Sequence, residues 1–199
     1  MVQTADQVAI NKIMGGGITF LIQTLDKKTD KDGMIINYPV YSKNSHVLFS
    51  FHHKGEIPVV LSPAAADSNM HFNNHKMNAN AKSIRIVGIK DMDSLISIYN
   101  DEGIKAAQLF NNKNVYTCEI AIALKNLGFS ASNPTRFRYH ILLNSGPNKT
   151  NGMNYHFTAP EGSSPEAHAM MEKMTAMTNN IEADLYSTTG FWGEYTLIN

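Results

Sequence analysis

The segment Ser83–Leu124 constrains the fold of this 199-residue chain more than any other part of its sequence. It contains several runs of β-branched and apolar residues of strand length, of which Tyr116–Leu124 is the clearest. Between two of these runs, Tyr99–Ile104 holds Asn, Asp and Gly, which begin turns and supply the positive φ of hairpin loops. Because strands joined by tight turns run antiparallel, this segment predicts an antiparallel β architecture.

Further segments have strand composition and length: Ile18–Leu25, Met34–Tyr41, His46–Phe51, Arg136–Asn144 and Gly190–Ile198. We therefore expect a single all-β domain over residues 1–199, an antiparallel β-sandwich of jelly-roll-like or immunoglobulin-like outline. One or two short helices are expected in long loops, around Pro63–Asn69 and from Ser164-Pro165, where a cap residue precedes proline. The polar stretch Asn69–Asn80 is expected to be a loop, and Gly15–Gly17 a bend or a close backbone approach.

The balance of charge argues against nucleic-acid and anionic-membrane partners, and the lack of a long apolar run argues against a membrane span. Lys and Arg number 17, as do Asp and Glu, so no long-range field attracts nucleic acid or an anionic membrane. No run of about 18 apolar residues exists, so no membrane span is expected. Cys118 is the one cysteine, which excludes an intrachain disulfide and favours a small buried hydrophobe.

Three motifs together resemble one family: Lys12–Thr19, Tyr38–Val40 and Tyr116–Leu124. They are similar to bacterial extracytoplasmic proteins with a carbohydrate-binding-family-9-like or DOMON-like β-sandwich, over roughly half of the chain. The resemblance implies a periplasmic or cell-surface location, although the chain shows no export signal. It also implies that earlier strands are missing and that Val2–Asp6 is the tail of an edge strand, with Met1 an internal or misassigned start or the chain a shortened form.

The last strand carries the candidate aromatic ligand residues. Trp192 and Tyr195 offer ring faces on which a sugar stacks. Strand alternation places Phe191 and Tyr195 on one face and Trp192 on the other, so core packing is the alternative interpretation. The sugar sites of the family rely on paired tryptophans, and this chain has one.

His71 and His75 stand four residues apart and would share one face of a helix, where they are metal candidates. Asn73 and Asn74 disfavour a helix, so we expect a polar loop and no metal, with His71, Asn74 and His75 as ligand-binding candidates. The site is expected on the concave sheet face or in the loops Asn69–Asn80 and Asn144–Asn154, whose asparagine side chains offer donors and acceptors to sugar hydroxyls.

The sequence contains no catalytic or nucleotide-binding motif, and no cofactor is expected. Met170, Met171, Met174 and Met177 recur at helical spacing, typical of flexible packing or of a soft interaction surface. The chain is therefore predicted to be a non-catalytic extracytoplasmic binding module for a glycan or another polar ligand. The alternative is an envelope interaction or scaffold protein that contacts an envelope partner through residues 170–177.

Overall fold

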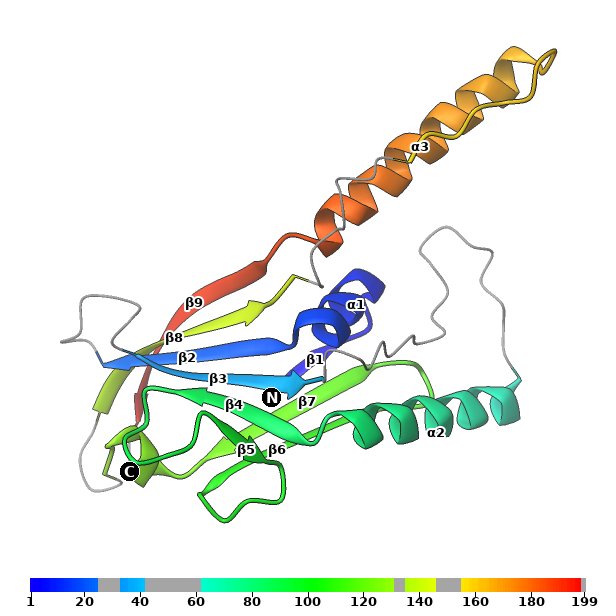
Figure 1. The fold of residues 1–199 in the computed structure, drawn as a ribbon. Coiled ribbons are helices and arrows are strands. Elements are labelled where there is room, and N and C mark those ends of the chain that lie inside the picture. The colour runs from blue at the N-terminus through cyan, green and yellow to red at the C-terminus, as the bar shows by residue number, and fades with distance from the viewer. Residues whose placement is uncertain (25–32, 42–61, 131–134, 146–154, 198–199) are drawn as a thin grey trace.

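The computed structural model describes residues 1–24, 33–41, 62–130, 135–145 and 155–197 (Figure 1). The helices of these residues are α1 (Gln7–Gly16), α2 (Pro63–Asn80), α3 (Pro165–Leu185) and the 3-10 helix η2 (Leu124–Leu127). The strands are β1 (Val2–Thr4), β2 (Ile18–Thr24), β3 (Met34–Val40), β4 (Ser83–Val87), β5 (Leu95–Ser97), β6 (Ile104–Phe110), β7 (Tyr116–Ile122), β8 (Thr135–Leu143) and β9 (Thr189–Leu197).

The strands form two sheets in which every pair is antiparallel. The smaller has the order β1-β7-β6 and the larger the order β5-β4-β3-β2-β8-β9. Alternation along β2 and β3 turns Ile18, Ile22 and Ile36 to the interior, and Ile104 and Phe110 of β6 reach the same buried cluster. The core is thus built by side chains of both sheets, each large one contributing about 1.5–3 kcal/mol.

Most of the strands expected from the sequence are present. Ile18–Leu25, Met34–Tyr41, Arg136–Asn144 and Gly190–Ile198 correspond to β2, β3, β8 and β9 within one or two residues. The edge strand expected near the N-terminus is also confirmed, because β1 pairs with β7 at the edge of the smaller sheet. The expected strand His46–Phe51 lies outside the described residues.

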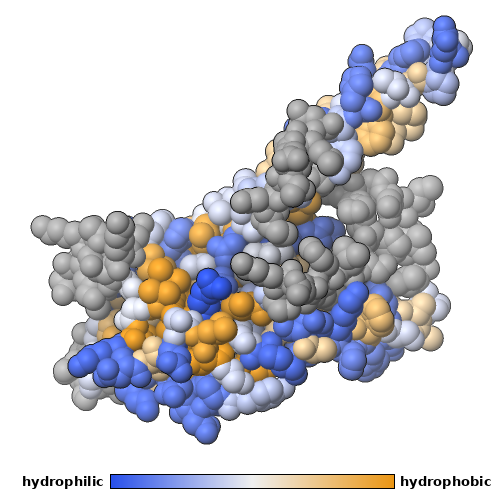
Figure 2. Space-filling view, viewed as in Figure 1, coloured by the Kyte–Doolittle hydropathy of each residue, from blue (hydrophilic) through white to orange (hydrophobic). Residues whose placement is uncertain are grey.

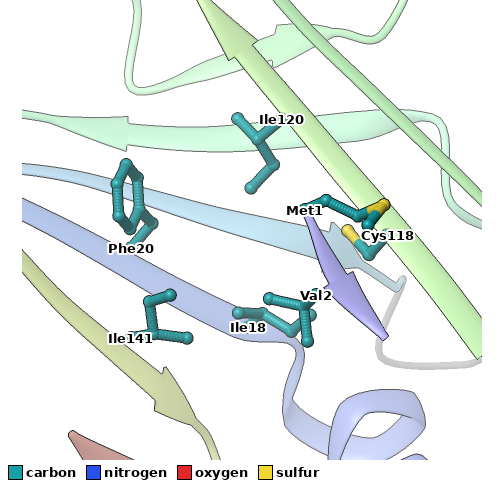
Figure 3. Close-up of a pocket in the computed structure, with 7 residues that line it drawn as sticks. All are labelled: Met1, Val2, Ile18, Phe20, Cys118, Ile120 and Ile141. Carbon is teal, nitrogen blue, oxygen red and sulfur yellow. The ribbon is translucent and has the colours of Figure 1, made fainter. Parts of the chain in front are cut away.

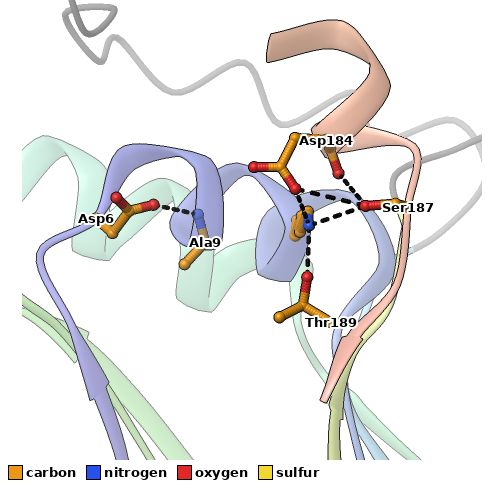
Figure 4. Close-up of polar contacts among 6 residues, drawn as sticks. Asp6, Ala9, Asp184, Ser187 and Thr189 are labelled. Carbon is orange, nitrogen blue, oxygen red and sulfur yellow. Dashed lines mark hydrogen bonds and ion pairs between the residues drawn. The ribbon is translucent and has the colours of Figure 1, made fainter. Parts of the chain in front are cut away.

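The all-β expectation is wrong, because helices cover a substantial part of the chain. Helix α1 was not expected, although its signals are present in the sequence. Asp6 caps it by accepting a hydrogen bond from the Ala9 backbone N–H at 2.9 Å (Figure 4). Gly17 ends it at φ +75°, so the glycine run that predicted a bend is the end of a helix.

The loop expected over Asn69–Asn80 is also wrong, because α2 continues to Asn80. The helix begins where expected, with Ser62 as its cap and Pro63 in its first turn. Its second half is held by tertiary contacts. Met77 is fully buried, and the Asn74 side chain bonds to the backbone of Phe110. These contacts override the weak helix propensity of asparagine.

The turn at Tyr99–Ile104 does not close a hairpin. It joins β5 to β6, and these strands belong to different sheets. Gly103 has the positive φ expected of it, +80°, but here it serves a crossover between sheets. The hairpin of this region instead joins β6 to β7, which pair from Ile104↔Ile122 to Phe110↔Tyr116.

Helix α3 projects from the body as an arm, with the extended segment 155–164 beside it (Figure 1). Its start at Pro165 is as expected, and Ser164 Oγ accepts a hydrogen bond from the Ala167 backbone N–H at 3.3 Å. At its other end, the buried ammonium of Lys12 lies 2.7 Å from Asp184 Oδ1 and donates to Thr189 Oγ1 at 2.7 Å. Figure 4 shows these acceptors converging where α3 joins β9.

Candidate functional site

A polar hollow lies on the outer face of the six-stranded sheet, where β2 and β3 meet the end of α1. We call it the outer-face crevice, and its volume of about 410 Å³ is in the range of small-ligand sites. In Figure 2, apolar and hydrophilic residues alternate over β2, β3 and β4, in keeping with a mixed lining. The lining residues are Gly15, Gly16, Thr19, Ile35, Asn37, Pro39, Val40, Tyr41, Arg85 and Asn144.

Three polar side chains form a connected network in this crevice. The Asn144 amide donates to the Gly16 carbonyl at 2.8 Å, and its Nδ2 and Oδ1 lie 3.0 and 3.1 Å from Thr19 Oγ1. The Asn37 amide donates to Thr19 Oγ1 at 3.2 Å. Thr19 pairs with Asn37 in the sheet register, so neighbouring strands present these groups on one face. The network holds the side chains in position before any ligand arrives.

The floor of the crevice is backbone that leaves no room for side chains. A Cβ on Gly16 would lie 2.2 Å from the Ser145 carbonyl oxygen, and one on Gly17 would lie 2.5 Å from the Pro39 carbonyl oxygen. Gly17 also has a φ of +75°, which L side chains rarely adopt. The close backbone approach expected for the glycine run is confirmed, and it brings α1, β3 and the end of β8 together.

Arg85 supplies the positive charge of the crevice. It is exposed on β4 and faces Asn37 across the β3–β4 pairing. Among the described residues it has no ion-pair partner, and the described lining contains no carboxylate. Burial raises the pKa of Tyr41 well above its usual range, so its hydroxyl stays neutral. The crevice thus combines one cation with neutral hydrogen-bonding groups.

A second hollow is apolar and lies between the two sheets (Figure 3). Phe20 and Ile141 of the larger sheet face Ile120 and Cys118 of the smaller one across a volume of about 90 Å³. Its described lining is apolar apart from the Cys118 thiol, so it offers few hydrogen-bonding partners to a polar ligand. This hollow is best explained as a gap in the packing.

Cys118 is buried, as expected from the sequence, with 2% of its surface exposed. Burial raises the pKa of its thiol to about 11, so the group stays protonated at neutral pH. A protonated, enclosed thiol is a poor nucleophile, and this agrees with its interpretation as a small hydrophobe.

Trp192 and Tyr195 lie on opposite faces of β9, so they do not form one site. The Tyr195 ring shares the inner face with Phe191 and lies 5.8 Å from the Phe137 ring. The Trp192 ring stacks on His140, with centroids 4.5 Å apart and an interplanar angle of 9°. Both rings are partly exposed, 39% for Trp192 and 54% for Tyr195.

His71, Asn74 and His75 lie on α2 and are not part of the lining of the outer-face crevice. Both histidines are exposed and line a shallow hollow of about 450 Å³ with Asn78 and Lys82. The polar atoms of Asn74 are already used, because Nδ2 donates to the Phe110 carbonyl at 2.8 Å and Oδ1 accepts from its N–H at 2.6 Å. In the part of the chain that the structure describes, no three His, Cys, Asp or Glu residues are grouped to hold a metal.

The methionines expected on a helix lie along the α3 arm. Three of them are exposed: Met170 by 62%, Met174 by 40% and Met177 by 42%. Because they recur every three or four residues, they form one stripe on the helix surface, which we call the Met stripe. Among the described helices, none is both long enough and apolar enough to cross a membrane.

Of the residues of the outer-face crevice, only Asn144 belongs to a segment expected from the sequence to contact a ligand. In the sequence, Asn37 and Thr19 are merely polar positions inside predicted strands, and Arg85 is one of several basic residues. The strand periodicity would have placed Thr19, Asn37 and Arg85 on solvent faces, but only the pairing of β2, β3 and β4 brings them together. The glycine run and the asparagine at Asn144 are the two sequence signals that point to this place.

Comparisons with protein-family models, with curated proteins and with solved structures found no match for this chain. The resemblance to carbohydrate-binding and DOMON-like proteins therefore stays a prediction.

Proposed function

We propose that this protein is a non-catalytic, extracytoplasmic binding module that holds a glycan in the outer-face crevice. The observation that carries the proposal is the network of Asn37, Thr19 and Asn144 above a backbone floor of glycine. Polar groups fixed in a concave site are what a polyhydroxylated ligand requires, because their orientation costs little on binding.

The chemistry of the lining suits sugar hydroxyls, which both donate and accept hydrogen bonds. Asn37 Oδ1 accepts no hydrogen bond from the described residues, so it is available to a ligand hydroxyl. Ile35, Pro39 and Val40 add apolar surface against which the C–H faces of a sugar ring pack. The described lining offers no carboxylate, imidazole or thiol as general acid or base, which favours binding over catalysis.

A β-sandwich arrangement is the structural part of this proposal. It is supported by the buried cluster that side chains of both sheets share, and by the inward alternation of β2 and β3. The extracytoplasmic location rests on the sequence resemblance alone.

Titration calorimetry of the purified protein against a panel of neutral and acidic polysaccharides and oligosaccharides tests the proposal. We expect binding to at least one glycan, and an affinity at least about tenfold lower in Asn37→Ala and Asn144→Ala, because each loses a hydrogen bond in the site. Asn112→Ala, at an exposed position of the β6–β7 loop, is the matched control and should bind as the wild type does. Failure to bind any glycan, or equal affinities in all variants, would refute the proposal.

A second candidate function is supported by the Met stripe. An exposed row of flexible, polarisable side chains on a projecting helix is typical of a surface that contacts another protein. An envelope protein would be the partner.

A further inference from the structure

We propose that the glycan bound in the outer-face crevice is acidic and that Arg85 binds its carboxylate. This inference rests on the proposed function and names the class of ligand for the same site. It follows from the charge of the crevice and from the position of Arg85 beside the polar network.

Arg85 differs from the other arginines of the six-stranded sheet. Arg136 contacts the carboxylate of Glu194, and Arg138 Nε lies 3.9 Å from the same carboxylate. Arg85 lacks such a partner among the described residues, and the described lining around it has no acidic group. Its guanidinium gives the described lining a positive charge with planar, forked donors.

The sheet register places this charge next to the hydrogen-bonding groups. Arg85 pairs with Asn37, and Asn37 pairs with Thr19, so three adjacent strands present the three side chains on one face. Neighbouring strands lie about 4.8 Å apart, so the row from Arg85 to Thr19 extends about 10 Å. A sugar hydroxyl that donates to Asn37 Oδ1, the open acceptor of the network, therefore places its ring beside Arg85 on the neighbouring strand.

A carboxylate fits this site better than a phosphate does. The planar guanidinium binds a carboxylate through two parallel hydrogen bonds, and one cation neutralises one negative charge. A phosphate monoester carries about −1.5 to −2 charges, which the single cation of the described lining would leave partly unbalanced. We therefore infer a uronic-acid type of glycan.

The test compares an oligogalacturonide with its fully methyl-esterified form, which differ only at the carboxyl groups. We expect the wild-type protein to bind the acid about tenfold more tightly at low salt, and the preference to fall as salt rises. Arg85→Gln should remove the preference, and Arg85→Lys should keep part of it. Lys113→Gln, at an exposed position on the other sheet's loop, changes the net charge equally and should keep the full preference.

The outcomes separate this inference from the proposed function. If the acid and the ester bind equally in the wild type, or if Arg85→Gln keeps the preference, the inference is overturned while glycan binding stands. Tighter binding of a sulfated glycan than of any carboxylated one also overturns it. If neither probe binds but a neutral glycan does, with loss in Asn37→Ala, the inference fails alone. If no glycan binds, the proposed function fails with it.

Discussion

Four ionisable side chains, those of Cys118, Tyr38, Tyr41 and Tyr116, occupy the interior near the buried Gln108. The Tyr116 hydroxyl donates to Gln108 Oε1 at 2.9 Å. Burial raises the pKa of each of the four groups, and for the Cys118 thiol the value is about 11. All four are therefore neutral in the folded protein at physiological pH. Each is compatible with the folded state in its protonated form, so its deprotonation at high pH favours unfolding.

The stability of the protein is expected to fall in mild alkali, in part because of Cys118. The unfolded thiol loses its proton near its ordinary value of 9.0 and the folded thiol near 11, so the unfolded state binds fewer protons between them. Stability is then full below about pH 9 and decreases as the pH rises towards 11. Between about pH 8 and pH 10.5, titration of the thiol should lower the free energy of unfolding by about 2 kcal/mol.

Urea unfolding at the two pH values, in the wild type and in Cys118→Ala, measures this contribution. The alanine variant should lose less stability over the interval, because the thiol titrates only in the wild type. Equal pH dependence in the two proteins would contradict the assignment.

At the scale of residues, the sequence predicts burial better than it predicts sites. Cys118 was identified as a buried hydrophobe because its neighbours on the strand alternate, which is local information. Trp192 and Tyr195 were placed correctly on opposite faces of one strand for the same reason. The hydrogen bonds among Thr19, Asn37 and Asn144 depend on which strands pair, and no local sequence pattern determines the strand pairing.

At the scale of elements, α2 shows how two adjacent asparagines act in opposite ways. Asn74 joins the helix to the backbone of Phe110 through two hydrogen bonds. Asn73 is fully buried, and neither atom of its amide has a hydrogen-bond partner. Burying an unpaired amide costs free energy, whereas removing one partner of a buried hydrogen bond leaves the other unsatisfied.

We therefore expect substitutions at these two positions to change the free energy of unfolding in opposite directions. Asn74→Ala should lower the free energy of unfolding by about 1–3 kcal/mol, because it leaves the Phe110 groups unpaired. Asn73→Leu should raise it by about 1 kcal/mol, since the branching and number of side-chain heavy atoms are kept and an unpaired amide is removed. Asn78→Ala, exposed on the same helix, is the control and should stay within about 0.5 kcal/mol of the wild type. Chemical denaturation checks all three, and destabilisation by Asn73→Leu would show that its amide is satisfied.

Helix α2 also shows why the sequence predicts some helices and strands more completely than others. The strands of the larger sheet were recognised because β-branched residues alternate along them. The start of α3 was recognised from Ser164-Pro165, a local signal that needs no tertiary partner. The helix predicted from the sequence ends at Asn69, whereas α2 continues to Asn80. Its second half is stabilised by contacts with Phe110 and by burial of Met77, and local sequence patterns do not reveal such tertiary contacts.

At the scale of the whole molecule, the α3 arm and the body are joined at one end. The buried Lys12 ammonium fixes that junction through Asp184, Ser187 and Thr189, and the rest of the arm projects away (Figure 1). At about 1.5 Å per residue, Met170 and Met174 lie about 22 and 16 Å along the helix from its Leu185 end, where the arm joins the body. The two proposed functions can therefore be tested independently.

Substitution of the Met stripe tests the interaction function without disturbing the fold. Met170→Lys with Met174→Lys should leave stability within about 1 kcal/mol, because both side chains are exposed. A partner captured by the wild type from envelope extracts of the native host should be lost, since charge at the stripe opposes apolar contact. Ala176→Lys, exposed but off the stripe, should retain it. Capture of the same partner by the double variant, or no capture by the wild type, would contradict this function.

The crowded glycines beneath the outer-face crevice also determine where new specificities can be found. Any β-carbon at Gly16 or Gly17 collides with neighbouring carbonyl oxygens, so a randomised library at these positions yields misfolded protein. The rim residues Ile35, Val40 and Arg85 carry no such restriction, because they extend from strands whose inward neighbours hold the core. If the crevice binds a glycan as proposed, diversity introduced at the rim alone should change which sugar it binds on an unchanged scaffold.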